Sequence, residues 1–272
     1  MPRRYDYTNE NPRNAKGKIM DVIIFSGQSN MQGSTGEKDL NPPVKNAFEY
    51  KYLTDTLVPL CNPVGEDIGD KVLCASALGN GSLVPAFCRA YAANGRQVVA
   101  IHAAKGDTSI SEWQKGTARF DTAVKKIKAG LLKVGDKSVN RIFVVWLQGE
   151  SDAIKRTSAE DYLKMLVKFK NDLKSEIPID KFAIIRQGYF AEYAPWVKGS
   201  EEEKKYADEQ IMKALDEAPA CDGDFLTLTR ICSELSVDEK YLNPNECGPH
   251  YNNAAMEIIG SIAGQALLNF AE

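Results

Sequence analysis

The chain has 272 residues, of which 43% are hydrophobic and 26% are charged, and its formal net charge is −3. These proportions are typical of a globular protein and exclude a disordered chain. The small negative charge gives no electrostatic basis for binding nucleic acid, and no apolar run of the sequence reaches membrane-spanning length. The length suits one large α/β domain whose partners are neither nucleic acid nor membrane.

Residues 1–17 are polar and charged, which predicts a loose N-terminal arm ahead of a single domain at 18–272. The basic start lacks the apolar segment of a signal peptide, so we expect a cytoplasmic protein. A secreted chain already trimmed of its signal has the same appearance, and that alternative stays open. The six cysteines form no C-x-x-C pair, which argues against a zinc site and fits reduced thiols.

Short apolar runs alternate with helical patterns along the chain. Runs rich in β-branched and aromatic residues predict five strands, at 20–25, 97–102, 141–147, 182–185 and 225–228. Apolar residues at helical spacing predict five helices, at 83–93, 120–132, 159–175, 201–217 and 252–270. Such alternation predicts a mainly parallel five-stranded sheet with helices on both faces.

Three features of these elements carry further expectations. Ser82 is positioned to cap the first helix, and Asn252 or Asn253 to cap the last. Residues 32–80 show no clear periodicity and are expected to form a long irregular excursion over the active face. The run of Glu and Lys in 201–217 is typical of a solvated helix face.

The first strand ends in a short polar turn, Gly27-Gln28-Ser29-Asn30. In open α/β sheets, ligands bind at the C-terminal ends of the strands. A serine on a tight strand-to-helix turn exposes its hydroxyl and leaves its own N–H free to face an oxyanion. The turn departs from the G-x-S-x-G elbow because Met31 stands at the second glycine. An ordinary loop with a satisfied serine is the alternative.

Polar residues also follow the second and third predicted strands. Gly106 and Thr108 come shortly after the second strand, and Gln148, Glu150 and Asp152 come directly after the third. Carboxylates crowded at the end of a buried strand are costly unless they are paired or used. They therefore either support a site or cap the next segment and pair with a basic residue.

The sequence contains only two histidines, His102 and His250. His250 lies in the loop before the last helix, where it can swing over a strand end and act as general base to a serine. A surface histidine beside a helix N-terminus is the alternative. His102 ends a buried strand and is interpreted as a structural side chain held by hydrogen bonds.

Together, three segments and a late histidine resemble one family. The segments are Gly27-Gln28-Ser29-Asn30-Met31, Lys105–Trp113 and Trp146-Leu147-Gln148-Gly149-Glu150-Ser151-Asp152. In this order they resemble the sialate O-acetylesterase and acetylxylan esterase branch of the SGNH hydrolases, over roughly residues 19–270. The resemblance implies a flavodoxin-like three-layer α/β/α sandwich. It also implies hydrolysis of O-acetyl groups on carbohydrates without a metal or organic cofactor.

The same resemblance implies roles for individual residues. Ser29 would be the nucleophile and His250 the general base. The backbone N–H groups of Ser29 and Gly81, with the Gln148 side chain, would form the oxyanion hole. The residues expected to support the site are Gln28, Asn30, Glu150, Asp152, Gly106 and Thr108.

One departure concerns the acid of the triad. The family places an aspartate three residues before the histidine, and this chain has Cys247 there. Glu246 is the first candidate for the acid, with Asp238 and Glu150 as alternatives. A serine–histidine pair without its carboxylate loses stabilisation of the imidazolium. A catalytically weak or inactive carbohydrate-binding protein therefore remains an alternative, as does a general short-chain or lipid esterase.

Aromatic residues near the strand ends are candidates for a wall that faces the sugar. The sequence suggests Trp113, Tyr189 and Phe190 for this role. It identifies neither the acetylated sugar nor the oligomeric state.

Overall fold

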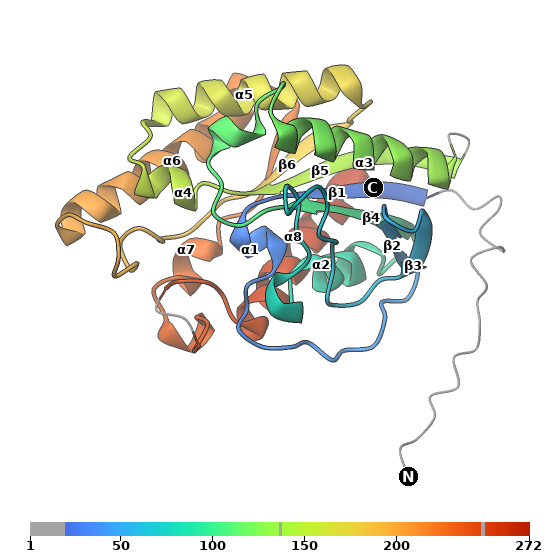
Figure 1. Ribbon diagram of the computed structural model, residues 1–272, viewed down its shortest axis with the longest axis horizontal. Coiled ribbons are helices and arrows are strands. Elements are labelled where there is room, and N and C mark those ends of the chain that lie inside the picture. Colours follow the sequence, from blue (N-terminus) through green and yellow to red (C-terminus); the bar gives the residue numbers. More distant parts are fainter. Residues whose placement is uncertain (1–19, 136–137, 246–247) are drawn as a thin grey trace, which may run out of the picture.

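The computed structural model describes residues 20–135, 138–245 and 248–272. Within these residues, seven strands form one sheet in the order β3-β2-β4-β1-β5-β6-β7. Helices α3, α5 and α6 cover one face and helices α2 and α8 cover the other (Figure 1). The predicted three-layer α/β/α fold is therefore confirmed, with two strands more than the five expected. The predicted arm at 1–17 lies outside the described residues.

The strands are β1 Met20–Gly27, β2 Ala47–Lys51, β3 Thr56–Pro59, β4 Gln97–Ala104, β5 Val139–Leu147, β6 Lys181–Ile185 and β7 Phe225–Thr229. All neighbouring strands run parallel except β2 and β3, which form an antiparallel pair at the edge of the sheet. The C-terminal ends of six strands therefore meet at one edge.

The helices are α1 Ser29–Gln32, α2 Val84–Tyr91, α3 Ala118–Val134, α4 Glu150–Ile154, α5 Ala159–Glu176, α6 Glu201–Cys221, α7 Cys232–Leu235 and α8 Asn253–Ala271. Asn252 caps α8 as expected, because its side chain accepts the N–H of Ala255 at 3.0 Å. Ser82 does not occupy the capping position of α2, which belongs to Leu83. Its hydroxyl instead donates to Oδ1 of Asn62 at 2.7 Å.

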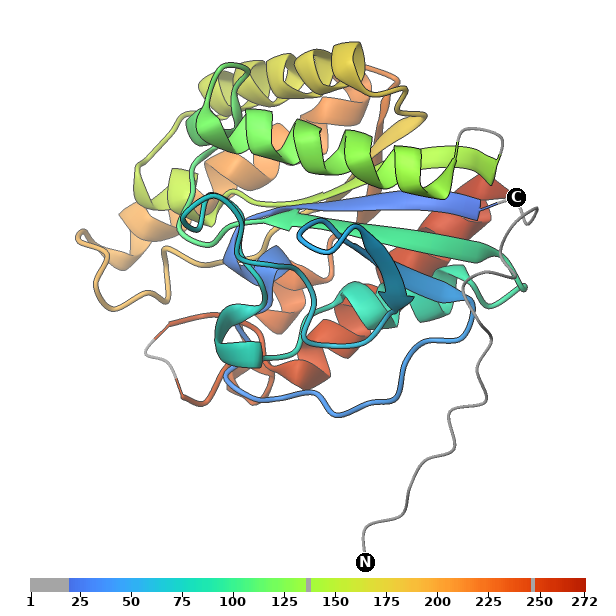
Figure 2. The same ribbon diagram turned by 45° about the vertical axis from the view of Figure 1, so that its right-hand side comes forward.

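Strand β1 lies at the centre of the molecule (Figure 2), and all eight of its residues are buried. Successive side chains of a strand point to opposite faces of the sheet. Val22 and Ile24 accordingly pack in the core under α3 and α5, while Ile23 and Phe25 pack in the core under α2 and α8. A strand buried on both faces has no polar face, which is why the central residues of β1 form a continuous apolar run.

The two unexpected strands, β2 and β3, lie inside the stretch 32–80 that was expected to be irregular. They are only five and four residues long. Glu49 on β2 is 1% exposed and forms an ion pair with Lys51 at 2.8 Å. A buried charge in so short a segment hides the alternation by which a strand is recognised. The expectation of a wholly irregular excursion was therefore wrong.

Helix α8 is long and apolar enough to cross a membrane by length and composition, with a mean hydropathy of 1.3 over its most apolar window. Half of that window is buried inside the protein. Gly260 and Gly264 lie against the backbone of Leu83 and Phe87, so that α8 packs closely on α2. The expectation that no run reaches spanning length is thus corrected, and core packing explains the apolar composition.

Candidate active site

Ser29 is the first residue of α1, and only Gln28 separates it from the end of β1 at Gly27. Gly27 has a φ of +148°, and a side chain at this position would overlap the carbonyl oxygen of Leu147. The N–H of Gln28 donates to that same oxygen at 3.1 Å, which fixes the turn against β5. The backbone N–H of Ser29 has no acceptor within α1, because it belongs to the first residue of the helix.

His250 lies beside Ser29 although the two residues are far apart in the sequence. The distance between His250 Nε2 and Ser29 Oγ is 2.8 Å. The loop that carries the imidazole is held on both sides. The N–H of Asn243 donates to the carbonyl of His250 at 2.7 Å, and the N–H of Tyr251 donates to Oδ1 of Asn30 at 3.3 Å. The structure therefore brings the predicted serine and histidine within hydrogen-bonding distance.

The two residues share a hollow of about 390 Å³, here called the active-site hollow. It is lined by Gln28, Ser29, Ser34, Lys105, Gly106, Asp107, Ser151, Ile154, Phe190, Trp196 and His250. Gly106 lies directly against the nucleophile candidate: a methyl group on it would come within 3.3 Å of Cβ of Ser29. Lys105 and Asp107 contribute one charge of each sign to the lining.

A buried carboxylate supports this arrangement from behind. Oε1 of Glu150 accepts a hydrogen bond from Nδ2 of Asn30 at 2.8 Å, and Asn30 in turn holds the N–H of Tyr251. Glu150 thus reaches the histidine loop through Asn30. Among the residues that the structure describes, Oε2 of Glu150 has no hydrogen-bond partner. Burial raises the pKa of Glu150 from 4.5 to about 7.

Replacing Glu150 with glutamine should therefore raise the stability of the protein at pH 8. The pKa of Glu150 is higher in the folded protein than in the unfolded chain, so the charged form opposes folding. This cost is complete above about pH 7 and absent below pH 4.5. The two pKa values set an upper limit of about 3 kcal/mol. Thermal unfolding at pH 8 and at pH 4.5 measures the effect, which should be confined to the higher pH.

Glu176→Gln is the matched control. The pKa of Glu176 is lowered to about 2, first by its hydrogen bonds with Lys115 and Lys128 and then by their charges. Its charged form favours folding, so its replacement should not stabilise the protein at pH 8. Equal melting temperatures of wild type and Glu150→Gln at pH 8 would contradict a buried, charged Glu150.

Gln148 does not point to the active-site hollow, contrary to its predicted place in the oxyanion hole. Its side chain is fully buried, and Nε2 donates to Oε1 of Gln28 at 3.1 Å, to the carbonyl of Thr108 at 2.9 Å and to Oδ2 of Asp152 at 2.6 Å. These contacts occupy its amide protons. Asp152 also accepts the N–H of Ile110 at 2.8 Å. Gln148, Thr108 and Asp152 therefore join the loops after β4 and β5 beneath the site.

Gly81 is also not placed for its predicted role. Its N–H donates to the carbonyl of Glu37 at 3.0 Å and to Oγ1 of Thr35 at 3.1 Å, so it is already used. The glycine that lies against Ser29 is Gly106, which was expected only to support the site. The N–H of Gly106 donates to Oε1 of Gln32 at 2.6 Å.

The candidates for the triad acid have different outcomes. Glu246 and Cys247 lie outside the described residues, so the assignment of Glu246 stays a prediction. Asp238 is a half-buried residue that pairs with Lys240 at 2.6 Å and caps the turn at Glu239–Tyr241. This use of its carboxylate argues against Asp238 as the acid.

Among the aromatic candidates for the sugar-facing wall, only Phe190 lines the active-site hollow. Trp113 is completely buried and packs edge-on against Trp146 at 5.5 Å, and Tyr189 lines a different surface hollow. Trp196, which the sequence analysis missed, lines the active-site hollow and is 54% exposed. It lies with other aromatic residues in an irregular loop, where no strand or helix periodicity marks which of them face the hollow.

His102 is a structural side chain, as interpreted from the sequence. It is 1% exposed, and its Nε2 lies 3.2 Å from the carbonyl oxygen of Met31. Burial lowers its pKa to about 3, so the imidazole is neutral at physiological pH.

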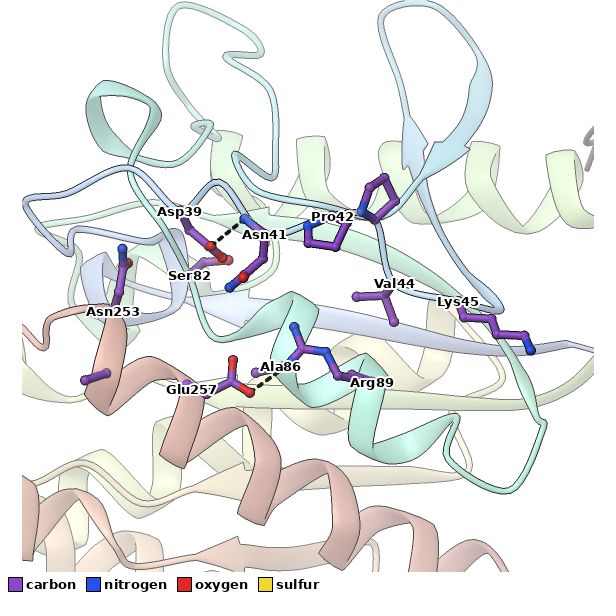
Figure 3. Close-up of a pocket in the computed structure, with 12 residues that line it drawn as sticks. Asp39, Asn41, Pro42, Val44, Lys45, Ser82, Ala86, Arg89, Asn253 and Glu257 are labelled. Atoms are coloured by element: carbon purple, nitrogen blue, oxygen red, sulfur yellow. Dashed lines mark hydrogen bonds and ion pairs between the residues drawn. The ribbon is translucent and has the colours of Figure 1, made fainter. Parts of the chain in front are cut away.

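A larger hollow of about 690 Å³ lies between the loop at 39–45 and helices α2 and α8 (Figure 3). Three of its charged groups are engaged with one another or with the loop. Arg89 pairs with Glu257 at 2.5 Å, and Asp39 accepts the N–H of Asn41 at 2.9 Å. The smaller hollow holds the serine–histidine pair, and we therefore base the chemistry on that one.

Comparisons with known proteins agree with this architecture. A "probable carbohydrate esterase" of Arabidopsis thaliana, At4g34215, is 22% identical over 185 residues, which are 61% of this chain and 67% of that protein. Its X-ray structure superposes with a TM-score of 0.68 at 20% identity, over 92% of this chain and 98% of that chain. NanS superposes with a TM-score of 0.64 at 15% identity, over 93% and 98%.

A lipase/acylhydrolase of Enterococcus faecalis superposes with a TM-score of 0.53 at 14% identity, over 93% of this chain and 97% of that chain. These likenesses establish the fold of the SGNH hydrolases. The family described as "SASA: carbohydrate esterase, sialic acid-specific acetylesterase" matches residues 19–223, three quarters of the chain. The chain belongs to this family of carbohydrate esterases.

Proposed function

We propose that this protein is a serine esterase that removes O-acetyl groups from carbohydrates through an acyl-enzyme. The observation that carries the proposal is the 2.8 Å distance between Ser29 Oγ and His250 Nε2 on the lining of one hollow. A serine is a weak nucleophile unless a base within hydrogen-bonding reach accepts its proton. Membership of the carbohydrate esterase family supports an acetylated saccharide as the substrate.

In the proposed reaction, Ser29 Oγ attacks the acetyl carbonyl carbon while its proton passes to His250 Nε2. The tetrahedral intermediate collapses, and the imidazolium returns that proton to the sugar oxygen as the ester bond breaks. Water then attacks the carbonyl carbon of the acetyl-Ser29 ester and gives a proton to His250. His250 passes this proton to Ser29 Oγ as the bond between Oγ and the acetyl carbon breaks, which regenerates the serine and releases acetic acid.

The negative oxygen of the intermediate needs donors beside Ser29. One is the N–H of Ser29 itself, at the start of α1. We assign the second to Nε2 of Gln28, which lines the active-site hollow. Oε1 of Gln28 accepts from Nε2 of Gln148 and from the N–H of Ser151, each at 3.1 Å. These two bonds set the orientation of the amide and leave its NH2 group for a ligand.

Two measurements test the function. The first is acetate release from acetylated xylo-oligosaccharides and from O-acetyl sialic acid, compared with hydrolysis of 4-nitrophenyl acetate and octanoate. Faster cleavage of acetylated sugars supports the proposal, and faster cleavage of octanoate favours a lipid esterase. The second is mass spectrometry after treatment with a fluorophosphonate, which should modify Ser29. An unmodified, inactive protein would favour a carbohydrate-binding role.

Replacing Trp196 with alanine should raise KM for an acetylated saccharide about fivefold and leave kcat for 4-nitrophenyl acetate nearly unchanged. The exposed indole face lies on the lining of the hollow, where a sugar ring can stack on it. Loss of about 1 kcal/mol of such contact corresponds to a factor of about five. Tyr206→Ala removes an aromatic ring of similar exposure, 62%, from α6 and serves as the control. Equal KM values for wild type and Trp196→Ala would contradict the stacking role.

A further inference from the structure

The loop between β6 and α6 forms an aromatic wall of the active-site hollow, made of Phe190 and Trp196. The ring of Phe190 lies 5.3 Å from the imidazole of His250 at an angle of 75°. The ring of Trp196 lies 6.4 Å from that of Phe190. Trp196 also lies so close to Gly248 that a side chain there would overlap its indole. The wall therefore contacts the histidine loop at two points.

The backbone of this wall is held by a single carboxylate from α6. Asp208 is completely buried. It accepts the N–H groups of Phe190 at 3.0 Å, Ala191 at 3.0 Å and Glu192 at 2.9 Å. Three consecutive N–H groups outside any helix or strand need acceptors once they are buried. The two carboxylate oxygens of Asp208 accept all three of them.

The position of Asp208 is costly, which indicates that it has a specific use. Burial raises its pKa to about 6 even though the three N–H groups act in the opposite direction. Ala207, Ile211 and Leu215 on the same helix are buried and apolar, so the carboxylate interrupts an apolar stripe. An apolar residue at this position would suit the core and would leave the three N–H groups of the loop without an acceptor.

We propose that Asp208 is a positioning residue for the esterase reaction: it fixes the aromatic wall, and the wall confines the imidazole of His250 against Ser29. This inference rests on the proposed function. According to this inference, Asp208 controls the geometry of the serine–histidine pair although it does not line the active-site hollow. Small displacements of a catalytic group lower the rate strongly, because the reacting atoms must stay near attack distance.

Asp208→Asn tests the proposal, because asparagine has the same shape but turns an NH2 group toward at least one N–H donor. In the folded variant we expect faster hydrogen exchange at the amides of 190–192. We also expect a change in acrylamide quenching of Trp196, since Trp113 and Trp146 are fully buried. kcat for 4-nitrophenyl acetate should fall about tenfold. Asp208→Glu, which retains the carboxylate, should restore part of each property.

Two controls separate positioning from simple stabilisation. Asp180→Asn removes a carboxylate that accepts the N–H of Ile142 at 2.7 Å, at the opposite end of the sheet. It should lower the melting temperature and leave kcat within twofold. A double-mutant cycle with Phe190→Leu is the second control. If Asp208 acts through the wall, the double variant loses less activity than the product of the two single losses.

The outcomes are distinguishable. An inactive wild type would overturn the proposed function, while amide exchange and quenching still report on the wall. Unchanged exchange at 190–192 and unchanged quenching in Asp208→Asn would overturn the positioning role whatever the activity. Wild-type kcat in the folded variant, or independent effects in the cycle, would overturn it as well.

Discussion

Alanine in place of Ser29 is expected to lower kcat for acetyl ester hydrolysis roughly 10⁴- to 10⁶-fold. The variant keeps the hollow and its donors but has no oxygen that can form the acyl-enzyme. Loss of the covalent step lowers kcat and leaves KM for the saccharide nearly unchanged. Steady-state acetate release from an acetylated saccharide measures both constants, and circular dichroism verifies that the variant is folded.

Ser34→Ala is the control for this experiment. Like Ser29, Ser34 is a serine that follows β1 and lines the active-site hollow. Its kcat should change less than tenfold. Fluorophosphonate should label Ser34→Ala as it labels the wild type, and should not label Ser29→Ala. Activity of Ser29→Ala above about 1% of wild type would contradict nucleophilic catalysis by Ser29.

Most of the fold could be predicted from sequence because the central strands are buried on both faces. Strand β1 has no exposed residue, and the uninterrupted apolar run Val22–Phe25 between Asp21 and Ser26 marks it clearly. The hairpin of β2 and β3 could not be predicted in this way. The buried Glu49 pairs with Lys51, whose side chain is 20% exposed, and a charge on the buried side breaks the apolar alternation of the strand.

The sequence indicated where the site lies but not which groups face the substrate. Gly81 and Gln148 have the chemistry of an oxyanion hole, yet both use their N–H groups within the protein. Residue type and strand order predict which residues lie near one another. The direction of an N–H group depends on backbone angles at Gly81 and on side-chain torsions at Gln148, and no motif specifies these. The position of His250 before the last helix allowed a pairing with Ser29 but left a surface histidine as the alternative, and the resemblance favoured the pairing across 221 positions of sequence.

Helix α6 shows how a local pattern can hide a functional residue. Its many Glu and Lys residues were interpreted as a solvated face, and several of them are indeed exposed. Asp208, however, lies on the apolar stripe with Ala207 and Ile211 and is buried. A lone carboxylate on the buried side of an amphipathic helix was the available signal, because such a position is costly unless the charge is used.

The second oxyanion donor can be identified by replacing Gln28 and Gln148, one at a time, with methionine. The methionine side chain has a similar length and no N–H group. Gln28→Met should lower kcat about 10²- to 10³-fold with little change in KM, since the lost hydrogen bond forms only to the charged oxygen of the intermediate. The reasons for choosing Gln28 are its place in the lining and the two donors, Gln148 Nε2 and Ser151 N–H, that hold its Oε1.

Gln148→Met is the matched variant, and its effect should be mainly on stability. The substitution leaves Oδ2 of Asp152 and the hydroxyl of Tyr162 with one partner fewer, because Gln148 contacts them at 2.6 Å and 2.8 Å. Lost buried hydrogen bonds of this kind cost about 1–3 kcal/mol each. We therefore expect a lower melting temperature and at most a tenfold loss of kcat, since Gln28 keeps its bond to Ser151. The opposite ranking of the two kcat values would return the oxyanion role to Gln148.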